Sequence, residues 1–141
     1  MRIALVACCG QKLDRAAPAS ELYISPLFKK AAAYARTFSG WYILSAKYGL
    51  VRPDAVIEPY NCTLLKMRKA DRVVWGLKVL KQMIAEGIAR AELVALAGAK
   101  YTEPLVRAGL SVETPMKGLG IGKQLRWLTR KAHGVTRGDE T

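Results

Sequence analysis

Four carboxylates lie in segments that follow predicted strands and could support acid–base chemistry: Asp14, Asp54, Glu58 and Glu103. We expect Glu103 in the first turn of a helix, where the helix dipole favours a carboxylate, so its structural interpretation is preferred. Asp14 and Glu58 each follow a glycine-bearing segment and have no evident capping role. They are therefore the predicted catalytic residues, suited to orienting a water molecule.

Residues that could bind a phosphate-bearing nucleobase ligand surround these carboxylates in the sequence. Tyrosines can stack on a base or donate a hydrogen bond, an asparagine amide can read a base edge, and lysines can hold phosphates. The lysines of this group are Lys12, Lys47, Lys100, Lys117 and Lys123. The other predicted ligand-binding residues are Cys8, Ser45, Tyr48, Tyr60, Asn61, Tyr101, Gly118, Gly120 and Gly122. Cys8 is interpreted as a small residue at a strand end, with a nucleophilic thiol as the less favoured alternative.

The cysteines and the histidine do not suggest a metal site. Cys8 and Cys9 are neighbours that point to opposite faces of a strand, and the third cysteine is Cys62. The one histidine, His133, is far from them in the sequence. A four-ligand zinc site, a Cys–His pair and a Ser–His–Asp triad are all disfavoured, so we expect no metal and no other cofactor.

The charge balance predicts a polyanionic partner. Lysine and arginine number 23 against 11 acidic residues, which gives a net charge of +12 and a pI near 9.9. Each phosphate that a basic residue neutralises releases counterions, so we expect nucleic acid, with DNA favoured, as the partner. The alternative is a basic surface without a ligand. A membrane surface is not expected, because no stretch is both strongly basic and rich in exposed aromatic residues.

A second basic feature is expected on helices. Lys123, Arg126 and Arg130 share one face of the last predicted helix, with Trp127 at its edge. A basic face edged by an aromatic residue suits contact with a nucleic-acid backbone together with stacking. The alternative, that Trp127 is a core residue and the charges are merely solvated, stays open. The predicted nucleic-acid surface comprises Arg68, Arg72, Arg126, Trp127 and Arg130.

The elements that must position these residues alternate between strands and helices. Apolar runs predict strands at 3–8, 41–45, 92–97 and 111–114, and helices are expected at 26–37, 64–86, 102–108 and from 123 to about 131. Ser25 with Pro26 forms a typical helix start. In the helix at 64–86 the expected core stripe is Ala70, Val73, Val74, Leu77, Leu80 and Ile84. The order predicts an α/β fold, a three-layer αβα arrangement with a four-stranded, mainly parallel sheet.

This topology explains why the unusual residues are expected together. Ligands of open parallel sheets bind outside the carboxyl ends of the strands. The segments that leave those ends, 8–14, 45–50, 97–103 and 115–123, each contain a glycine and a lysine. Glycine lets the backbone approach a ligand closely, and lysines and helix N-termini favour an anion. The sequence therefore predicts an anion site along this rim of the sheet.

Length and composition set the remaining expectations. The 141 residues are 51% hydrophobic and 24% charged, which predicts one α/β domain at 1–133 and a polar tail at 134–141. No run reaches the ~20 apolar residues that cross a bilayer, and the first residues do not resemble an export signal, so the expected location is the cytoplasm.

Several blocks of the sequence resemble an uncharacterised bacterial and phage domain family. That family shows a Leu-Ser-Ala-Lys-(His/Tyr)-Gly-Leu block followed by Pro-Tyr-Asp-x-Thr-Leu. The resemblance rests on residues 8–14, 22–28, 44–51, 58–60, 63–64 and 118–125. Residues 44–60 are also similar to YaaA-type peroxide-stress proteins, which bind DNA. A more distant similarity runs to domains of archaeosine-synthase proteins and to the uracil-DNA-glycosylase type of α/β fold.

The resemblance implies a role on nucleic acid or a nucleobase. Two departures matter: Asn61 stands where the family has aspartate, and Gly10 stands where it has a basic residue. If that aspartate were the family's catalytic base, this chain would be inactive or would rely on Asp14 or Glu58. The leading hypothesis is a DNA-binding protein that acts on a nucleobase or nucleotide, with glycosylase-like hydrolysis as the expected reaction. The alternatives are a non-catalytic DNA-binding module and an enzyme for a free nucleotide or phosphosugar.

Overall fold

A five-stranded sheet forms the middle of the protein, with the strand order β4-β3-β1-β6-β7. The computed structural model describes residues 1–7 and 11–134. The strands are β1 (Arg2–Ala7), β3 (Gly40–Ser45), β4 (Gly49–Val51), β6 (Glu92–Leu96) and β7 (Val112–Glu113). β1 is central and pairs in parallel with β3 on one side and β6 on the other. The chain therefore leaves β1 in one direction and later returns to its other side, which creates a switch point between β1 and β6.

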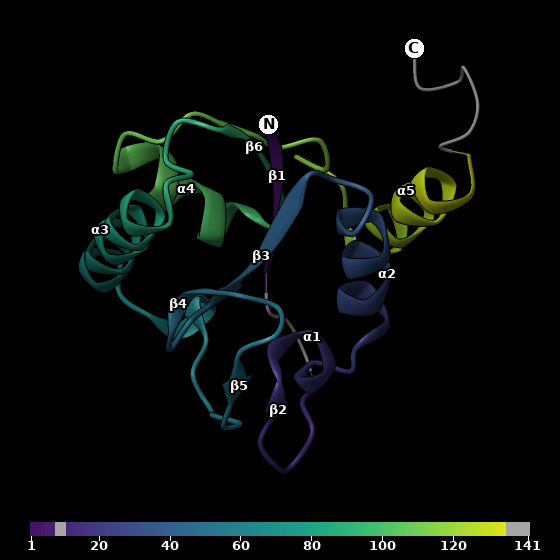
Figure 1. The fold of residues 1–141 in the computed structure, drawn as a ribbon, viewed down its shortest axis with the longest axis horizontal. Helices are drawn as coiled ribbons and strands as arrows, with labels where there is room; N and C mark the ends of the chain where they lie inside the picture. Colours follow the sequence, from purple (N-terminus) through teal and green to yellow (C-terminus); the bar gives the residue numbers. More distant parts are fainter. Residues whose placement is uncertain (8–10, 135–141) are drawn as a thin grey trace.

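Helices cover both faces of this sheet (Figure 1). α2 (Pro26–Ala35) packs with α5 (Ile121–Gly134) on one face, and α3 (Lys69–Glu86) packs with α4 (Ala99–Arg107) on the other. The buried parts of these elements join in one hydrophobic core around β1, whose residues from Ile3 to Ala7 are all buried. The predicted three-layer α/β fold with a mainly parallel sheet is confirmed.

The sheet differs from the prediction by one strand, because β4 adds an antiparallel edge. β4 pairs with β3, with Ser45 opposite Gly49. The chain reverses at Gly49, whose φ of +79° is a left-handed conformation that favours glycine. With three residues, β4 is too short to produce a hydrophobic pattern, so the sequence indicated only an irregular segment. A separate two-stranded sheet, formed by β2 (Ala17–Pro18) and β5 (Val56–Ile57), lies beside the short helix α1 (Ala19–Leu22).

The predicted helix at 64–86 is two helices. A short 3₁₀ helix, η1 (Leu64–Lys66), is capped by the Thr63 hydroxyl, which accepts from the N–H of Leu65. Extended backbone at Met67 and Arg68 then separates η1 from α3. At the other end the prediction is accurate, since α3 ends at Gly87 in the left-handed conformation. The cap of α2 is also as expected, because Ser25 accepts from the N–H of Phe28.

The predicted core stripe of α3 is mostly wrong, although Leu80 is half-buried and packs against the core. Val74, Leu77 and Ile84 are 66%, 46% and 61% exposed, and Ala70 is exposed as well. The buried residues of α3 are instead Trp75, Gly76, Val79 and Met83. A Cβ at Gly76 would lie 2.5 Å from the carbonyl oxygen of Pro104, so the missing side chain sets which face approaches α4. Apolar periodicity cannot detect this, because glycine adds nothing to the pattern.

The ends of the chain complete the description. α5 reaches Gly134, and the rest of the predicted polar tail lies outside the described residues. In the described part of the chain, none of the helices is both long enough and apolar enough to cross a membrane.

Candidate functional site

The carboxyl ends of β1, β3, β6 and β7 lie along one edge of the sheet, because these strands are parallel. Two groups of side chains gather there. We call the first the tyrosine cluster, which consists of Lys12, Tyr23, Ser45, Lys47, Tyr48 and Tyr60. We call the second the basic pocket, a cavity lined by Lys69, Arg72, Arg107 and Lys117 together with Glu103 and several apolar residues.

Ser45 organises the tyrosine cluster from the last position of β3, where it is fully buried. Its hydroxyl oxygen accepts from the N–H groups of Lys47 at 3.2 Å and Tyr48 at 3.0 Å. The same hydroxyl donates to the phenol oxygen of Tyr60 at 2.8 Å. Tyr60 in turn shares a 2.7 Å hydrogen bond with the phenol of Tyr23. Three hydroxyl groups therefore form one connected chain at the end of β3.

Cations lie against the rings of this cluster. The Lys12 ammonium nitrogen is 4.7 Å from the ring centre of Tyr60, and that of Lys47 is 5.3 Å from the ring centre of Tyr48. The rings of Tyr48 and Tyr60 meet edge to face at 5.5 Å. Cation–π attraction holds both lysines at the sheet edge. The structure thus brings together five predicted ligand-binding residues and adds Tyr23, which carried no chemical signal of its own in the sequence.

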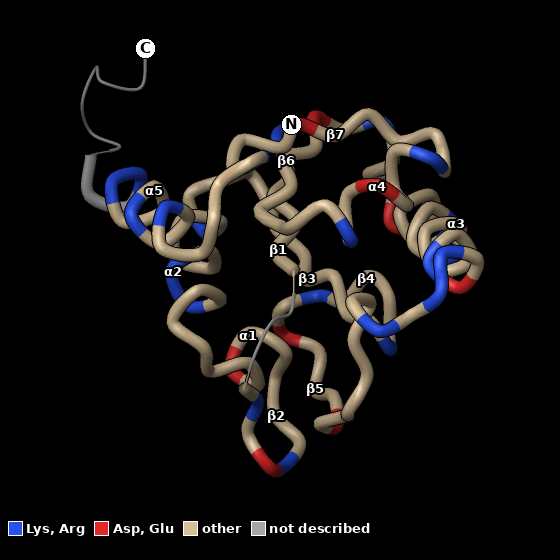
Figure 2. The backbone as a smooth tube through the Cα atoms, turned by 180° about the vertical axis from the view of Figure 1, so that it is seen from behind, with Lys and Arg blue, Asp and Glu red and all other residues tan. Residues whose placement is uncertain are grey.

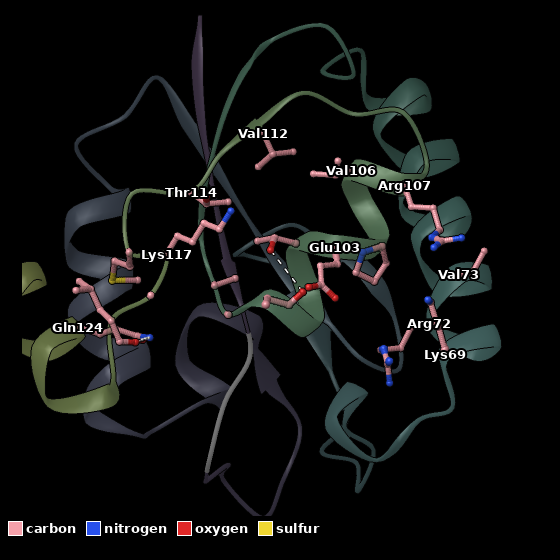
Figure 3. A pocket seen from close by; sticks show the side chains of 18 residues that line it. Lys69, Arg72, Val73, Glu103, Val106, Arg107, Val112, Thr114, Lys117 and Gln124 are labelled. Atoms are coloured by element: carbon pink, nitrogen blue, oxygen red, sulfur yellow. Dashed lines mark hydrogen bonds between the residues drawn. The ribbon is translucent and has the colours of Figure 1, made fainter.

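The basic pocket runs from the carboxyl end of β6 along α4 and β7 and has a volume of about 910 Å³ (Figure 3). Lys69 and Arg72 reach it from α3, Arg107 from α4 and Lys117 from the loop after β7. Lys69 and Arg107 are not among the predicted ligand-binding residues. Lys117 was predicted, but only because it lies in a loop that follows a strand. Their convergence depends on helix packing between α3 and α4, which the sequence does not specify.

The electrostatics of the basic pocket favour an anion. Within the described residues, none of its four cations takes part in a salt bridge, because the ion pairs there involve other arginines. Ala97, Gly98 and Ala99 also line the pocket, and α4 begins there with Gly98 as its N-cap. A helix N-terminus carries partial positive charge and points N–H groups outward. Like charges repel when they converge, so a bound anion would relieve that repulsion.

Glu103 is the one carboxylate among the residues that line the basic pocket. In the view of Figure 3 it lies between Lys117 on one side and Lys69 and Arg72 on the other. The prediction that Glu103 sits in a first helical turn is wrong, because α4 starts at Ala99 rather than near residue 102. The Gly98–Ala99 pair before the apolar positions was the signal for the earlier start.

Trp75 of α3 links the end of β3 to α4. Its indole N–H donates to the backbone carbonyl of Ser45 at 2.9 Å, and its ring meets that of Tyr101 edge to face at 5.7 Å. Tyr101 is only 8% exposed and is not among the residues that line the basic pocket. The ring predicted to stack on a base is therefore packed inside the protein.

The two predicted catalytic carboxylates do not lie at the basic pocket. The Asp14 side chain is 96% exposed and pairs with Arg15 at 3.5 Å. Glu58 is exposed as well, and its backbone carbonyl, rather than its carboxylate, accepts a 3.5 Å hydrogen bond from the Tyr48 phenol. Asn61 is exposed beside Tyr60. Position after a glycine-bearing segment was therefore a poor guide to which carboxylate reaches a cavity.

The other residues that were predicted from the loops have different positions in the structure. Gly118 lines the basic pocket with a φ of +83°, a conformation that favours glycine. A Cβ at Gly120 or Gly122 would meet nothing within 4 Å, so those two positions have no steric need for glycine. Lys100 is exposed outside the lining of the pocket. Cys8, with Cys9 and Gly10, lies outside the described residues.

The predicted nucleic-acid surface falls in three places. Lys123, Arg126, Trp127 and Arg130 line a shallow cavity of about 610 Å³ on α5, which we call the α5 hollow. Arg72 belongs to the basic pocket, whereas Arg68 is exposed and pairs with Asp71 at 3.3 Å. Figure 2 shows the basic residues spread along α2, α3 and α5. Among the described residues there is no group of three His, Cys, Asp or Glu side chains that could hold a metal ion.

The fold and this cavity define the class: a doubly wound α/β protein with a basic cavity that runs from the carboxyl end of β6 along α4 and β7. The chain belongs to a family of unknown function (DUF6884), whose model matches residues 3–130. It is also similar to the "Uncharacterized protein YfjM" of Bacillus subtilis (strain 168), with 28% identity over 141 residues that cover 92% of this chain and 93% of that protein. The expected membership of an uncharacterised family is confirmed.

Proposed function

We propose that this protein binds DNA and holds one nucleotide of it in the basic pocket. The observation that carries the proposal is that Lys69, Arg72, Arg107 and Lys117 line one cavity without a salt-bridge partner in the described residues, and that the N-terminus of α4 lines it as well. Phosphate is the ligand that this combination of cations and helix N–H groups suits best.

Size and position support the same proposal. Ligand cavities in proteins commonly measure roughly 300–1,000 Å³, and the basic pocket, at about 910 Å³, has room for a nucleotide. Ala97 and Gly98, which line it, follow the carboxyl end of β6, and doubly wound folds bind ligands outside the carboxyl ends of their strands. The resemblance of residues 44–60 to YaaA-type DNA-binding proteins points to the same class of partner.

Glu103 favours a second, catalytic candidate: removal of a base from DNA by hydrolysis, as the resemblance to the uracil-DNA-glycosylase type implies. In that reaction a water oxygen bonds to the sugar C1′ while the bond from C1′ to the base nitrogen breaks and its electron pair stays on the base. Glu103 would accept the proton of that water, because it is the carboxylate that lines the pocket.

Salt-dependent binding tests the DNA proposal. Fluorescence anisotropy with a labelled single-stranded DNA should show an affinity that falls steeply between about 50 mM and about 200 mM salt. Replacing Lys69 and Lys117 with glutamine should weaken binding and make the salt slope shallower by about 1.4, since each lost phosphate contact to a single strand removes about 0.7. The matched control, Lys29→Gln with Lys81→Gln, makes the same charge change at exposed sites outside the pocket.

Two results would refute the binding proposal: no DNA binding at low salt, or equal weakening by the pocket and control variants. For the catalytic candidate, the protein is incubated with DNA that carries modified bases, and released base is measured. Glu103→Gln should slow release at least about a hundredfold, whereas Asp14→Asn and Glu58→Gln should not. Binding without any release would identify a non-catalytic DNA-binding module.

A further inference from the structure

The α5 hollow has the chemistry of a second nucleic-acid contact. Its charged residues are all basic, namely Lys123, Arg126 and Arg130, and none of them forms a salt bridge within the described residues. Leu119, Leu125 and Trp127 supply apolar surface between these charges. Cations around an apolar floor that includes an aromatic ring suit a phosphate backbone together with an unstacked base.

Trp127 is held in place from the protein side. Its ring meets Tyr34 of α2 edge to face at 5.6 Å, and the Lys131 ammonium nitrogen lies 5.4 Å from its centre. The residue is half-buried, so the remaining part of its surface faces the hollow. The helix beneath it is anchored as well, because Lys30 of α2 donates to the Thr129 hydroxyl at 2.8 Å. An aromatic surface fixed in this way loses little entropy when a base stacks on it.

The α5 hollow adjoins the basic pocket at Leu119. Leu119 lines both cavities, and it belongs to the loop that carries Lys117 and Gly118 into the basic pocket. The carbonyl of Leu119 accepts a 2.8 Å hydrogen bond from the Gln124 side chain, and this bond fixes the loop to the first turn of α5. A ligand that leaves the basic pocket over Leu119 therefore arrives at Lys123 and Trp127.

We infer that the basic pocket and the α5 hollow bind successive nucleotides of one single strand. The inference rests on the proposed function and adds to it the form of the ligand, a single strand rather than a duplex. Arg126 and Arg130 hold the backbone phosphates, and Trp127 with Leu125 contacts a base. A duplex does not fit this role, because the faces of its bases are already stacked on one another.

The length dependence of binding tests this inference. Chemical-shift titrations compare thymidine monophosphate with single-stranded oligothymidylates of about four and about eight nucleotides. The oligonucleotides should bind at least about tenfold more tightly than the mononucleotide, since they reach both cavities. Arg126→Gln combined with Arg130→Gln should remove most of that gain and leave mononucleotide affinity unchanged. Trp127→Leu should weaken oligonucleotide binding by at least about fivefold, the lower end of base–aromatic stacking.

The control is Lys81→Gln combined with Arg90→Gln, which removes the same charge at exposed positions outside both cavities. Equal losses in the control and in the Arg126 and Arg130 variant would overturn the inference, and so would oligonucleotides that bind no more tightly than the mononucleotide. Tighter binding of a duplex of the same length would overturn the single-strand assignment. Failure of the mononucleotide and the oligonucleotides alike would instead refute the proposed function, so the two failures are distinguishable.

Discussion

Gly49 gives the sharpest test of how the end of β3 is built. Its φ is +79°, and a Cβ at this position would overlap the Oε1 atom of Gln82. Gln82 occupies that space because its amide clamps the β3–β4 turn to α3: Oε1 accepts from the N–H of Leu50 at 2.7 Å, and Nε2 donates to the carbonyl of Tyr48 at 3.1 Å. Gly49→Ala therefore forces a left-handed alanine and displaces the clamp.

The magnitude follows from two contributions. The left-handed conformation of a residue with a Cβ costs about 1–2 kcal/mol. Loss of the two Gln82 hydrogen bonds adds about 1 kcal/mol each. The free energy of unfolding should fall by about 3–4 kcal/mol in total. Gly87→Ala is the matched control, because Gly87 has a φ of +76° and a Cβ there would meet nothing within 4 Å. Gly87→Ala should lower the free energy of unfolding only by the conformational contribution of about 1–2 kcal/mol.

The assay is equilibrium urea unfolding of four variants: Gly49→Ala, Gly87→Ala, Gln82→Ala and the double variant at 49 and 82. With Gln82 truncated there is no clamp left to displace, so the double variant should be more stable than additivity predicts, by about 1–2 kcal/mol. Equal destabilisation by Gly49→Ala and Gly87→Ala, or strict additivity at 49 and 82, would refute the reasoning.

Three further predictions concern packing, pH and the tyrosine cluster. Gly76→Ala places a Cβ 2.5 Å from the carbonyl oxygen of Pro104. Urea unfolding should therefore show a free energy of unfolding lower by about 1–3 kcal/mol, although alanine has the better helix propensity. A stabilised variant would show that α3 and α4 are not closely packed. The hydrogen bond from Arg52 holds the pKa of Glu86 below its ordinary value of 4.5, so this pair stabilises the fold above that pH and stops doing so as the pH falls through the lowered pKa. Urea unfolding of Glu86→Gln over a pH series should show a flatter acid-side decline than the wild type, and an unchanged slope contradicts the assignment. Tyr60→Phe should lower the free energy of unfolding by about 1–2 kcal/mol, because two buried hydroxyl neighbours lose a partner; unchanged stability would show that this hydrogen-bond chain does not form in solution.

The sequence predicted the elements whose signals are local. Strands buried on both faces appear as continuous apolar runs, so β1, β3 and β6 were recognisable, and the Ser25 cap marked the start of α2. The buried face of α3 was not recognisable, because it depends on the close approach of Gly76 to Pro104. The antiparallel edge strand β4 was missed because three residues carry no periodicity.

The candidate site, like the fold, was predictable in part from the sequence. The rule that ligands bind beyond the carboxyl ends of parallel strands correctly predicts that Lys12 and Ser45 lie near one another, and Tyr60 contacts both. The rule could not show which carboxylate lines a cavity, since Glu103 reaches the basic pocket only because α4 starts at Ala99. It also could not show that Lys69 and Arg107 converge, because they lie on different helices whose packing is a tertiary property.

The central claim is that the basic pocket binds a phosphate-bearing nucleotide, and one measurement tests it most directly. In a ¹H–¹⁵N chemical-shift titration of the whole chain with thymidine monophosphate, the amide signals of Gly98, Ala99 and Gly118 should move saturably. The signal of Gly87, at the far end of α3 from Lys69 and Arg72, should stay in place. Movement confined to residues outside the basic pocket, or no movement at saturating nucleotide, would contradict the claim.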